Sequence, residues 1–152
     1  MAKIRITEAE LRRMIIGAVK SRLNEERSEN IDTKIEELIS YLHNAQKPVR
    51  EIHWNTNEYA LHKTTDEAIG NLFSWEDRLG ETYIADRDIE LKIGDKKPSS
   101  DTDFKSIVNE MIDLASSIKE SISGNKEYDN IAAVLDEIME TGKSLLYKGQ
   151  LK

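Results

Sequence analysis

Four ionisable side chains recur at helical spacing in the middle of the chain, namely His62, Asp66, Asp77 and Glu81. The first two are four residues apart, and so are the last two, so on a helix each pair lies on one face, one turn apart. Imidazole and carboxylate groups suit Fe(II), Mn(II) or Zn(II), of which iron and manganese would support redox chemistry, whereas zinc would only stabilise or inhibit. Because the chain has no cysteine, thiolate ligands, disulfides and cysteine nucleophiles are excluded. We expect a metal site of His, Asp and Glu.

The interval between the two pairs decides whether they can share one ion. Asp66 and Asp77 are eleven residues apart, which is roughly 16 Å along a helix axis. One ion cannot bridge that distance within one chain. The midpoint of the two aspartates is 71.5, and so is the midpoint of His62 and Glu81. If two copies cross antiparallel about a two-fold axis there, close to Gly70, two identical clusters result, each with ligands from both subunits.

The helix that carries these residues is predicted over about 58–85. At about 100° per residue, its core face contains Leu61, Thr64, Ala68, Leu72, Trp75, Leu79 and Thr82. The ionisable residues lie nearly opposite, and they are interspersed with Tyr59, Ile69, Phe73 and Ile84. A solvated face does not normally collect such apolar side chains, so we expect this face to meet a second surface.

Three further helices are predicted around this one, which gives an all-α four-helix bundle. The first begins at the capping box Thr33/Glu36 and ends near His53, with a kink expected at Pro48. His53 continues its apolar face and could supply a further nitrogen ligand. A connection over 86–100, with room for one short helical turn, leads to two amphipathic helices over about 104–123 and 128–146.

Composition sets the broad class of the protein. The 152 residues are 38% hydrophobic and 34% charged, with two prolines, which favours one mostly helical domain. No apolar run approaches the roughly 20 residues that span a bilayer, and no secretory signal is recognised. A cytoplasmic location is expected, with association with a virion left open.

Residues 1–23 differ in charge from the rest of the chain. They contain six basic and two acidic residues, whereas the whole chain has a net charge of −7. The capping box Thr7/Glu10 predicts a short amphipathic helix over about 8–24, followed by a polar linker over 24–30. We therefore divide the chain into residues 1–30, a basic helix with its linker, and residues 31–152, the bundle. The basic helix could dock another protein, DNA or a membrane surface.

Three motifs resemble those of the Dps family, the miniferritins of the ferritin superfamily: HWN at 53–55, ALHKTTDE at 60–67 and WEDRLGE at 75–81. The resemblance implies a ferritin-like four-helix bundle that binds Fe(II), as a single ion or a di-iron pair, at a dimer interface. It implies these ligands: His53, His62, Asp66, Asp77 and Glu81. It also implies oxidation of Fe(II) by peroxide or oxygen, iron storage, oxidative protection and, beyond the homodimer, a hollow dodecameric cage. The loop between HWN and the next histidine is three residues shorter than in the family.

A second reading keeps the bundle and the dimer contact but not the chemistry. In it the protein is a structural or interaction protein whose dimer is insensitive to metal, with an association with a phage left open. His43 and Glu76 are predicted to be ordinary surface residues, and Trp75 to be a packing residue.

Overall fold

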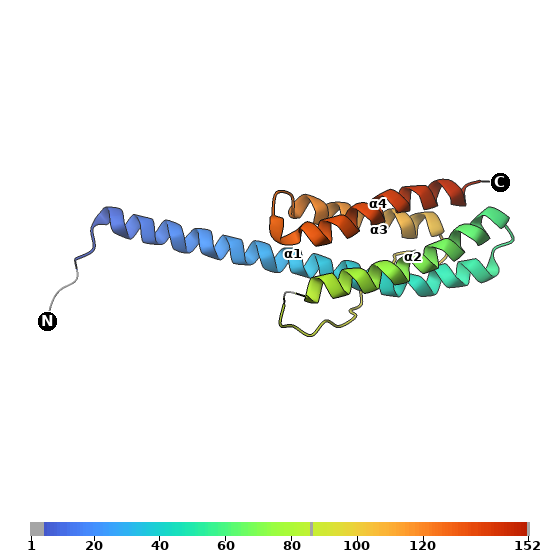
Figure 1. The fold of residues 1–152 in the computed structure, drawn as a ribbon, viewed down its shortest axis with the longest axis horizontal. Helices are drawn as coiled ribbons and strands as arrows, with labels where there is room; N and C mark the ends of the chain where they lie inside the picture. The colour runs from blue at the N-terminus through green and yellow to red at the C-terminus, as the bar shows by residue number, and fades with distance from the viewer. Residues whose placement is uncertain (1–4, 86, 152) are drawn as a thin grey trace. The chain divides into compact units, whose positions relative to one another are not determined.

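The computed structural model describes residues 5–85 and 87–151. The chain divides into two compact units, Met1–Thr33 and Lys34–Lys152. The helices are α1 (Glu8–Asn55), α2 (Tyr59–Ile84), α3 (Phe104–Ser121), the short 3₁₀ helix η1 (Lys126–Tyr128) and α4 (Asp129–Gly149) (Figure 1). The described residues contain no strand, which confirms the all-α prediction.

In the second unit, residues 34–55 of α1 form a four-helix bundle with α2, α3 and α4 (Figure 1). Cross-links between α1 and α2 show that the two helices are antiparallel: the Tyr83 hydroxyl donates to Glu36 (3.0 Å), and the Gln46 amide donates to Glu76 (2.5 Å). Helix α4 is antiparallel to α2, because Lys148 pairs with Glu67 (3.2 Å) and Arg78 pairs with Glu137. It is also antiparallel to α3, to which a short connection joins it, and Lys119 near the end of α3 pairs with Asp136 early in α4 (2.6 Å) (Figure 1). Helices α2 and α3 are therefore parallel, and the one long connection in the bundle joins them.

The core face of α2 agrees with the predicted periodicity. Its buried residues are Thr64, Thr65, Ala68, Leu72, Trp75, Leu79, Gly80 and Tyr83. Trp75, at 1% exposure, is a packing residue as expected. Leu61 and Thr82, predicted at the two ends of this face, are only partly buried. Burial of this stripe orients the opposite face of α2 outward.

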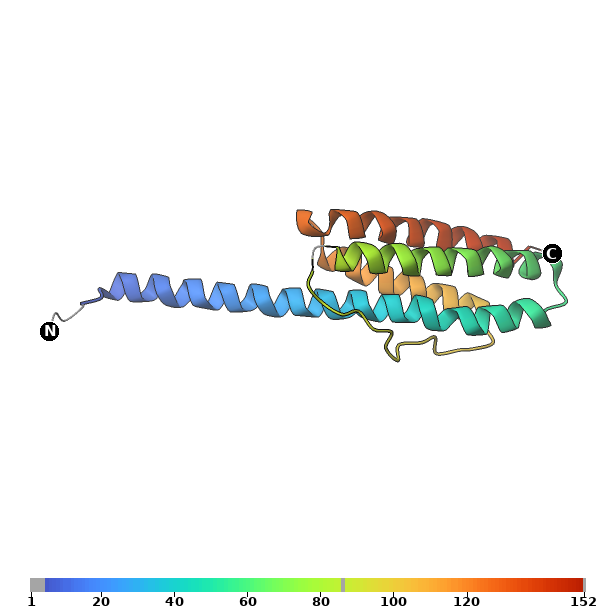
Figure 2. The ribbon, with the colours of Figure 1, turned by 60° about the horizontal axis from the view of Figure 1, so that its bottom comes forward.

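The long connection packs along α1 (Figure 2). The Gly94 amide donates to the Ser40 hydroxyl (2.8 Å), and the Asn44 amide donates to the carbonyls of Gly94 (3.0 Å) and Lys96 (2.8 Å). Further along, the Ser99 amide donates to the Glu110 carboxylate (3.0 Å). The described part of this connection contains no helical turn, so the short turn considered from sequence is absent there.

Two sequence predictions about α1 need correction. The linker expected over 24–30 is helical, and the basic helix is part of α1 and not a separate element. This segment contains no glycine or proline, and Glu and Arg are good helix formers, so its polarity reflects exposure and not a break. Pro48 lies inside α1 without ending it, and the helix ends at Asn55, where a break was predicted.

Candidate metal site

Two histidines meet where α1 ends and α2 begins. The Nδ1–H of His53 donates to the carbonyl of His62 (2.9 Å), and the Nδ1–H of His62 donates to the carbonyl of His53 (3.0 Å). The two rings are stacked, with centroids 4.1 Å apart and planes inclined by 21°. The shorter loop between HWN and His62 therefore still brings the two imidazoles into contact.

These bonds determine which ring nitrogens remain available. A carbonyl oxygen only accepts, so Nδ1 of each ring must carry the proton. In the neutral imidazole, Nε2 is then left with a lone pair. Histidines that bind metals are commonly held in this way, with the other ring nitrogen donating to a carbonyl or a carboxylate. Thr65 adds a second acceptor for the His53 Nδ1–H at 3.1 Å, while its own hydroxyl donates to the Leu61 carbonyl (2.7 Å).

The three predicted carboxylate ligands lie on the outward face of α2. Asp66, Asp77 and Glu81 are all exposed. Within the described residues, none of the three carboxylates makes a hydrogen bond or an ion pair with another side chain. Their negative charges are therefore uncompensated inside one subunit, and all their acceptor positions are free for an ion.

One chain alone does not assemble the predicted ligands into a complete site. Among residues 5–85 and 87–151, no group of three or more His, Asp or Glu side chains is close enough together to hold a metal ion. The structure brings His53 next to His62, with Asp66 one turn further along α2. The Asp77/Glu81 pair lies further along the same helix, so joining the two groups requires a second chain.

The middle of the outward α2 face is open and partly apolar. Phe73 is 65% exposed and Tyr59 is 74% exposed, and Trp54, next to His53, is 68% exposed. At Gly70 an added Cβ would meet no atom within 4 Å, so another helix could approach closely there. Phe73 lies about one turn from Gly70, whereas Tyr59 begins α2 and Trp54 lies at the end of α1. Exposed aromatic side chains of this kind are typical of protein contact surfaces.

His43 is a polar group whose role the sequence reading missed. Its Nδ1 lies 2.6 Å from the Glu76 carboxylate, which also accepts from the Gln46 amide. The Glu76 side chain is only 19% exposed, so the prediction that it is a surface residue is wrong. His43 itself is exposed, as predicted, but its ring is anchored. The pair depends on the antiparallel register of α1 and α2, which places 43 opposite 76 and which no local pattern in the sequence sets.

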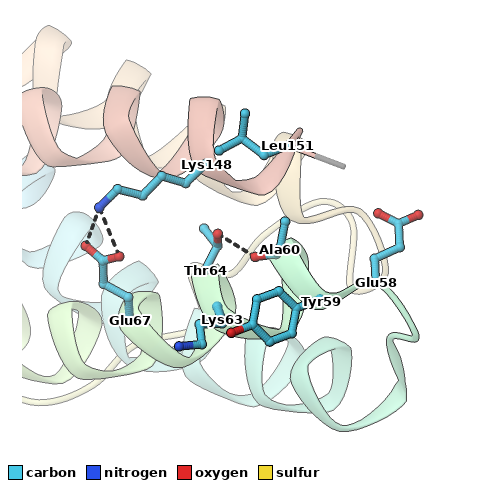
Figure 3. Close-up of a pocket in the computed structure, with 8 residues that line it drawn as sticks. All are labelled: Glu58, Tyr59, Ala60, Lys63, Thr64, Glu67, Lys148 and Leu151. Atoms are coloured by element: carbon cyan, nitrogen blue, oxygen red, sulfur yellow. Dashed lines mark hydrogen bonds and ion pairs between the residues drawn. The ribbon is translucent and has the colours of Figure 1, made fainter.

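A groove lies apart from the histidine pair, between the start of α2 and the end of α4 (Figure 3). Its charged groups compensate each other, because Lys148 pairs with Glu67 at 3.2 Å (Figure 3). The Lys63 ammonium lies over the Tyr59 ring, 5.5 Å from its centre. No residue that lines the groove is a histidine or a paired nucleophile and base. The groove is therefore not the candidate site.

These observations define an all-helical bundle protein with an outward face of potential metal ligands. Comparison with protein families matches residues 53–148 to a family of unknown function, DUF5856. The match covers more than half of the chain, which therefore belongs to this family, and the matched range begins at His53 and contains every predicted ligand. Searches of curated proteins and of solved structures gave no match. No helix in the described residues is long and apolar enough to cross a membrane.

Proposed function

We propose that the protein is a dimer that binds and oxidises Fe(II) at two equivalent sites between its subunits. Each site takes His53, His62 and Asp66 from one chain and the pair at positions 77 and 81 from the other. The reciprocal hydrogen bonds of His53 and His62 carry this proposal, because they fix the two stacked imidazoles in place and leave a lone pair on each Nε2.

The arrangement of α2 supports the dimer. Asp66 and Asp77 lie symmetrically about position 71.5, and so do His62 and Glu81. The exposed Gly70 lies close to that point. An antiparallel crossing of two α2 helices would cover Phe73 and bring Asp66 of each chain opposite position 77 of the other. A two-fold contact of this kind uses the same surface of both subunits. Each subunit would therefore supply the ligands that the site on the other subunit lacks.

The connectivity supports a ferritin-like reading of the bundle. One long connection joins two parallel helices, α2 and α3, while short loops join the antiparallel pairs α1/α2 and α3/α4. A single long crossover is the arrangement of ferritin-like bundles. Hollow assemblies of such dimers would store the ferric product.

In the proposed reaction the same ligands bind iron before oxidation, as Fe(II), and after it, as Fe(III). Two Fe(II) ions lose one electron each; hydrogen peroxide takes up both electrons and two protons, its O–O bond breaks, and two waters leave. The three carboxylates favour the more highly charged Fe(III) product by Coulomb attraction. The exposed aromatic side chains would limit water access once the two subunits meet.

An anaerobic Fe(II) titration followed by addition of hydrogen peroxide tests the proposal. The full chain should develop ferric absorbance faster than buffer alone. The double variant His62→Ala/Asp66→Ala should lose this acceleration, whereas Asp113→Asn, which removes an exposed carboxylate on α3, should retain it. Equal rates for buffer, wild type and the double variant would exclude an iron-oxidising role.

A non-catalytic dimer is the second candidate function. The absence of a three-ligand group within the described residues of one chain favours it, as does the apolar character of the outward α2 face. In that case the dimer would form equally well with and without metal, and chelators would change neither its mass nor its thermal stability.

A further inference from the structure

The segment over residues 5–23, hereafter the basic segment, has helix signals of its own. The Thr7 amide donates to the Glu10 carboxylate (2.8 Å), and the Glu10 amide donates to the Thr7 hydroxyl (3.2 Å). This capping box confirms the start predicted from sequence. Arg12 pairs with Glu8 one turn earlier at 2.8 Å. Both acidic residues of the segment are thus engaged at the helix start, where negative charge is favourable.

An apolar arc covers more than half of this helix. At about 100° per residue, seven apolar residues fall within one arc of roughly 200°: Leu11, Met14, Ile15, Ile16, Ala18, Val19 and Leu23. The large side chains among them are all between 49% and 61% exposed. Lys20 and Arg13 lie on the opposite side, whereas Arg22 and the Glu8–Arg12 ion pair fall within the arc. The basic segment is therefore an amphipathic helix whose apolar side chains are uncovered.

The width of the arc argues against a coiled coil with a second copy. A coiled coil needs a narrow stripe with a repeat of seven residues. Here the stripe that begins at Leu11, Ile15 and Ala18 continues to Arg22 and then to acidic residues. Pairing along it would bury the guanidinium group of Arg22, about three turns after Leu11. A flat apolar medium accepts a wide arc, and the long stem of Arg22, which lies near the middle of the arc, lets its guanidinium group reach the polar headgroup region.

The net positive charge of the basic segment indicates which kind of apolar medium it would bind. Residues 1–23 contain six basic and two acidic residues. After residue 23 the sign changes, because residues 24–30 contain three glutamates and one arginine. A basic amphipathic helix that is too polar to span a bilayer binds at the interface of anionic lipid.

We propose that the basic segment binds anionic lipid surfaces, lying in the interface with its apolar arc among the acyl chains. The acidic stretch after residue 23 limits contact to this segment. This binding is independent of iron, so it stands or falls separately from the proposed metal site.

Flotation of the full chain with vesicles tests the proposal. Vesicles of phosphatidylcholine mixed with phosphatidylglycerol should retain the protein, and vesicles of phosphatidylcholine alone should not. High salt should weaken binding because it screens the headgroup charge. Replacing Arg13 and Lys20 by Glu should lower the affinity by at least about tenfold, since each basic residue near an anionic surface contributes roughly a factor of five.

Two double variants with equal charge change separate the apolar arc from charge alone. Ile15→Asp/Val19→Asp places carboxylates inside the arc, and Ser21→Asp/Asn24→Asp places them outside it. The first should abolish binding, and the second should only reduce it. Equal binding by both variants, or equal binding to both kinds of vesicle, would overturn the proposal. A third result would also overturn it: the wild-type chain does not bind vesicles, and Ile15→Asp/Val19→Asp, but not Ser21→Asp/Asn24→Asp, changes the mass of the protein in solution. The apolar arc would then be a contact between protein chains.

Discussion

At the residue scale, the two histidines combine a structural role with a possible chemical one. The His53 carbonyl lies in the last turn of α1, where carbonyls lack a partner within the helix. The His62 Nδ1–H supplies that partner at 3.0 Å. The same bond that closes the helix end therefore also holds the ring in place. Alanine at position 62 removes both this donor and the proposed ligand, so a second kind of substitution is needed to tell the two roles apart.

Asparagine at either position separates the two roles, because its side-chain amide can donate as Nδ1–H does but has no counterpart of Nε2. We expect His53→Asn and His62→Asn to fold with little loss of helix content. Their affinity for Fe(II), or for Co(II) as a spectroscopic probe, should fall at least about 100-fold, given that even outer-shell changes cost 10- to 100-fold. Anaerobic titration monitored by absorbance measures this. Wild-type affinity in both variants would show that the rings serve only as caps.

Glu110 is a second residue whose environment gives a testable pH dependence. Burial opposes its charged form, but hydrogen bonds from the Ser99 hydroxyl and amide, and from Tyr41, outweigh burial and lower the pKa of Glu110. The Tyr41 hydroxyl also contacts the Ile107 carbonyl at 2.7 Å, and burial raises the pKa of Tyr41. The carboxylate thus ties the long connection to α1 and α3.

Because the folded pKa of Glu110 is depressed, its stabilisation is present above the unfolded value near 4.5 and is lost as pH falls below it. Glu110→Gln should lower the free energy of unfolding at neutral pH by about 1–3 kcal/mol through weakened hydrogen bonds. It should also flatten the fall in stability below pH 4.5. Urea unfolding across this range measures both effects, with exposed Asp113→Asn as the matched control. An unchanged acid slope in Glu110→Gln would contradict this account.

At the element scale, α2 presents one face to the core and one to the outside, and the sequence predicts both faces. The periodicity of Ala68, Leu72, Trp75 and Leu79 predicted the buried face, because the core of a bundle selects apolar residues at helical spacing. The outward position of the carboxylates follows from the same geometry. Their meeting with a partner remains a prediction, since it depends on a second chain.

The elements that sequence reasoning missed share a physical cause. The break expected over 24–30 rested on polarity, yet glutamate and arginine favour helix wherever no packing opposes it. The His43–Glu76 contact depends on the register between α1 and α2. This register is set by tertiary packing, so no local sequence pattern predicts it. Local rules therefore located the helices and the outward stripe but not the contacts between helices.

Gly70 tests the proposed crossing of two α2 helices. Glutamate there meets no clash within one chain and improves helix propensity by roughly 0.5–1 kcal/mol. Gly70→Glu should therefore leave the fold intact while placing like charges opposite each other at the two-fold axis, which should shift the dimer to monomer. Light scattering across a dilution series measures the mass. Gly17→Glu, at an equally open helical glycine on α1, should leave it unchanged. An unaltered dimer in Gly70→Glu would place the contact elsewhere.

At the scale of the whole molecule, metal and assembly are linked if the ligands come from two chains. An ion that binds only the folded dimer stabilises it by mass action, by about 2.7 kcal/mol at 100 times its dissociation constant. For a chain of this size that corresponds to a rise of roughly 5–10 °C in Tm. The dimer should also persist to lower protein concentration with metal than without it.

Thermal unfolding of the wild type and of Asp66→Asn, with and without Co(II), measures this linkage. Wild-type Tm should rise with Co(II) and fall back on chelation, while Asp66→Asn should respond much less, because each of the two sites loses a ligand. Without metal, the variant should be at least as associated as the wild type, since removing two uncompensated carboxylates from the interface relieves repulsion. A wild-type dimer whose mass and Tm ignore Co(II) would instead favour the structural role, with the apolar side chains around Gly70 as its sole basis.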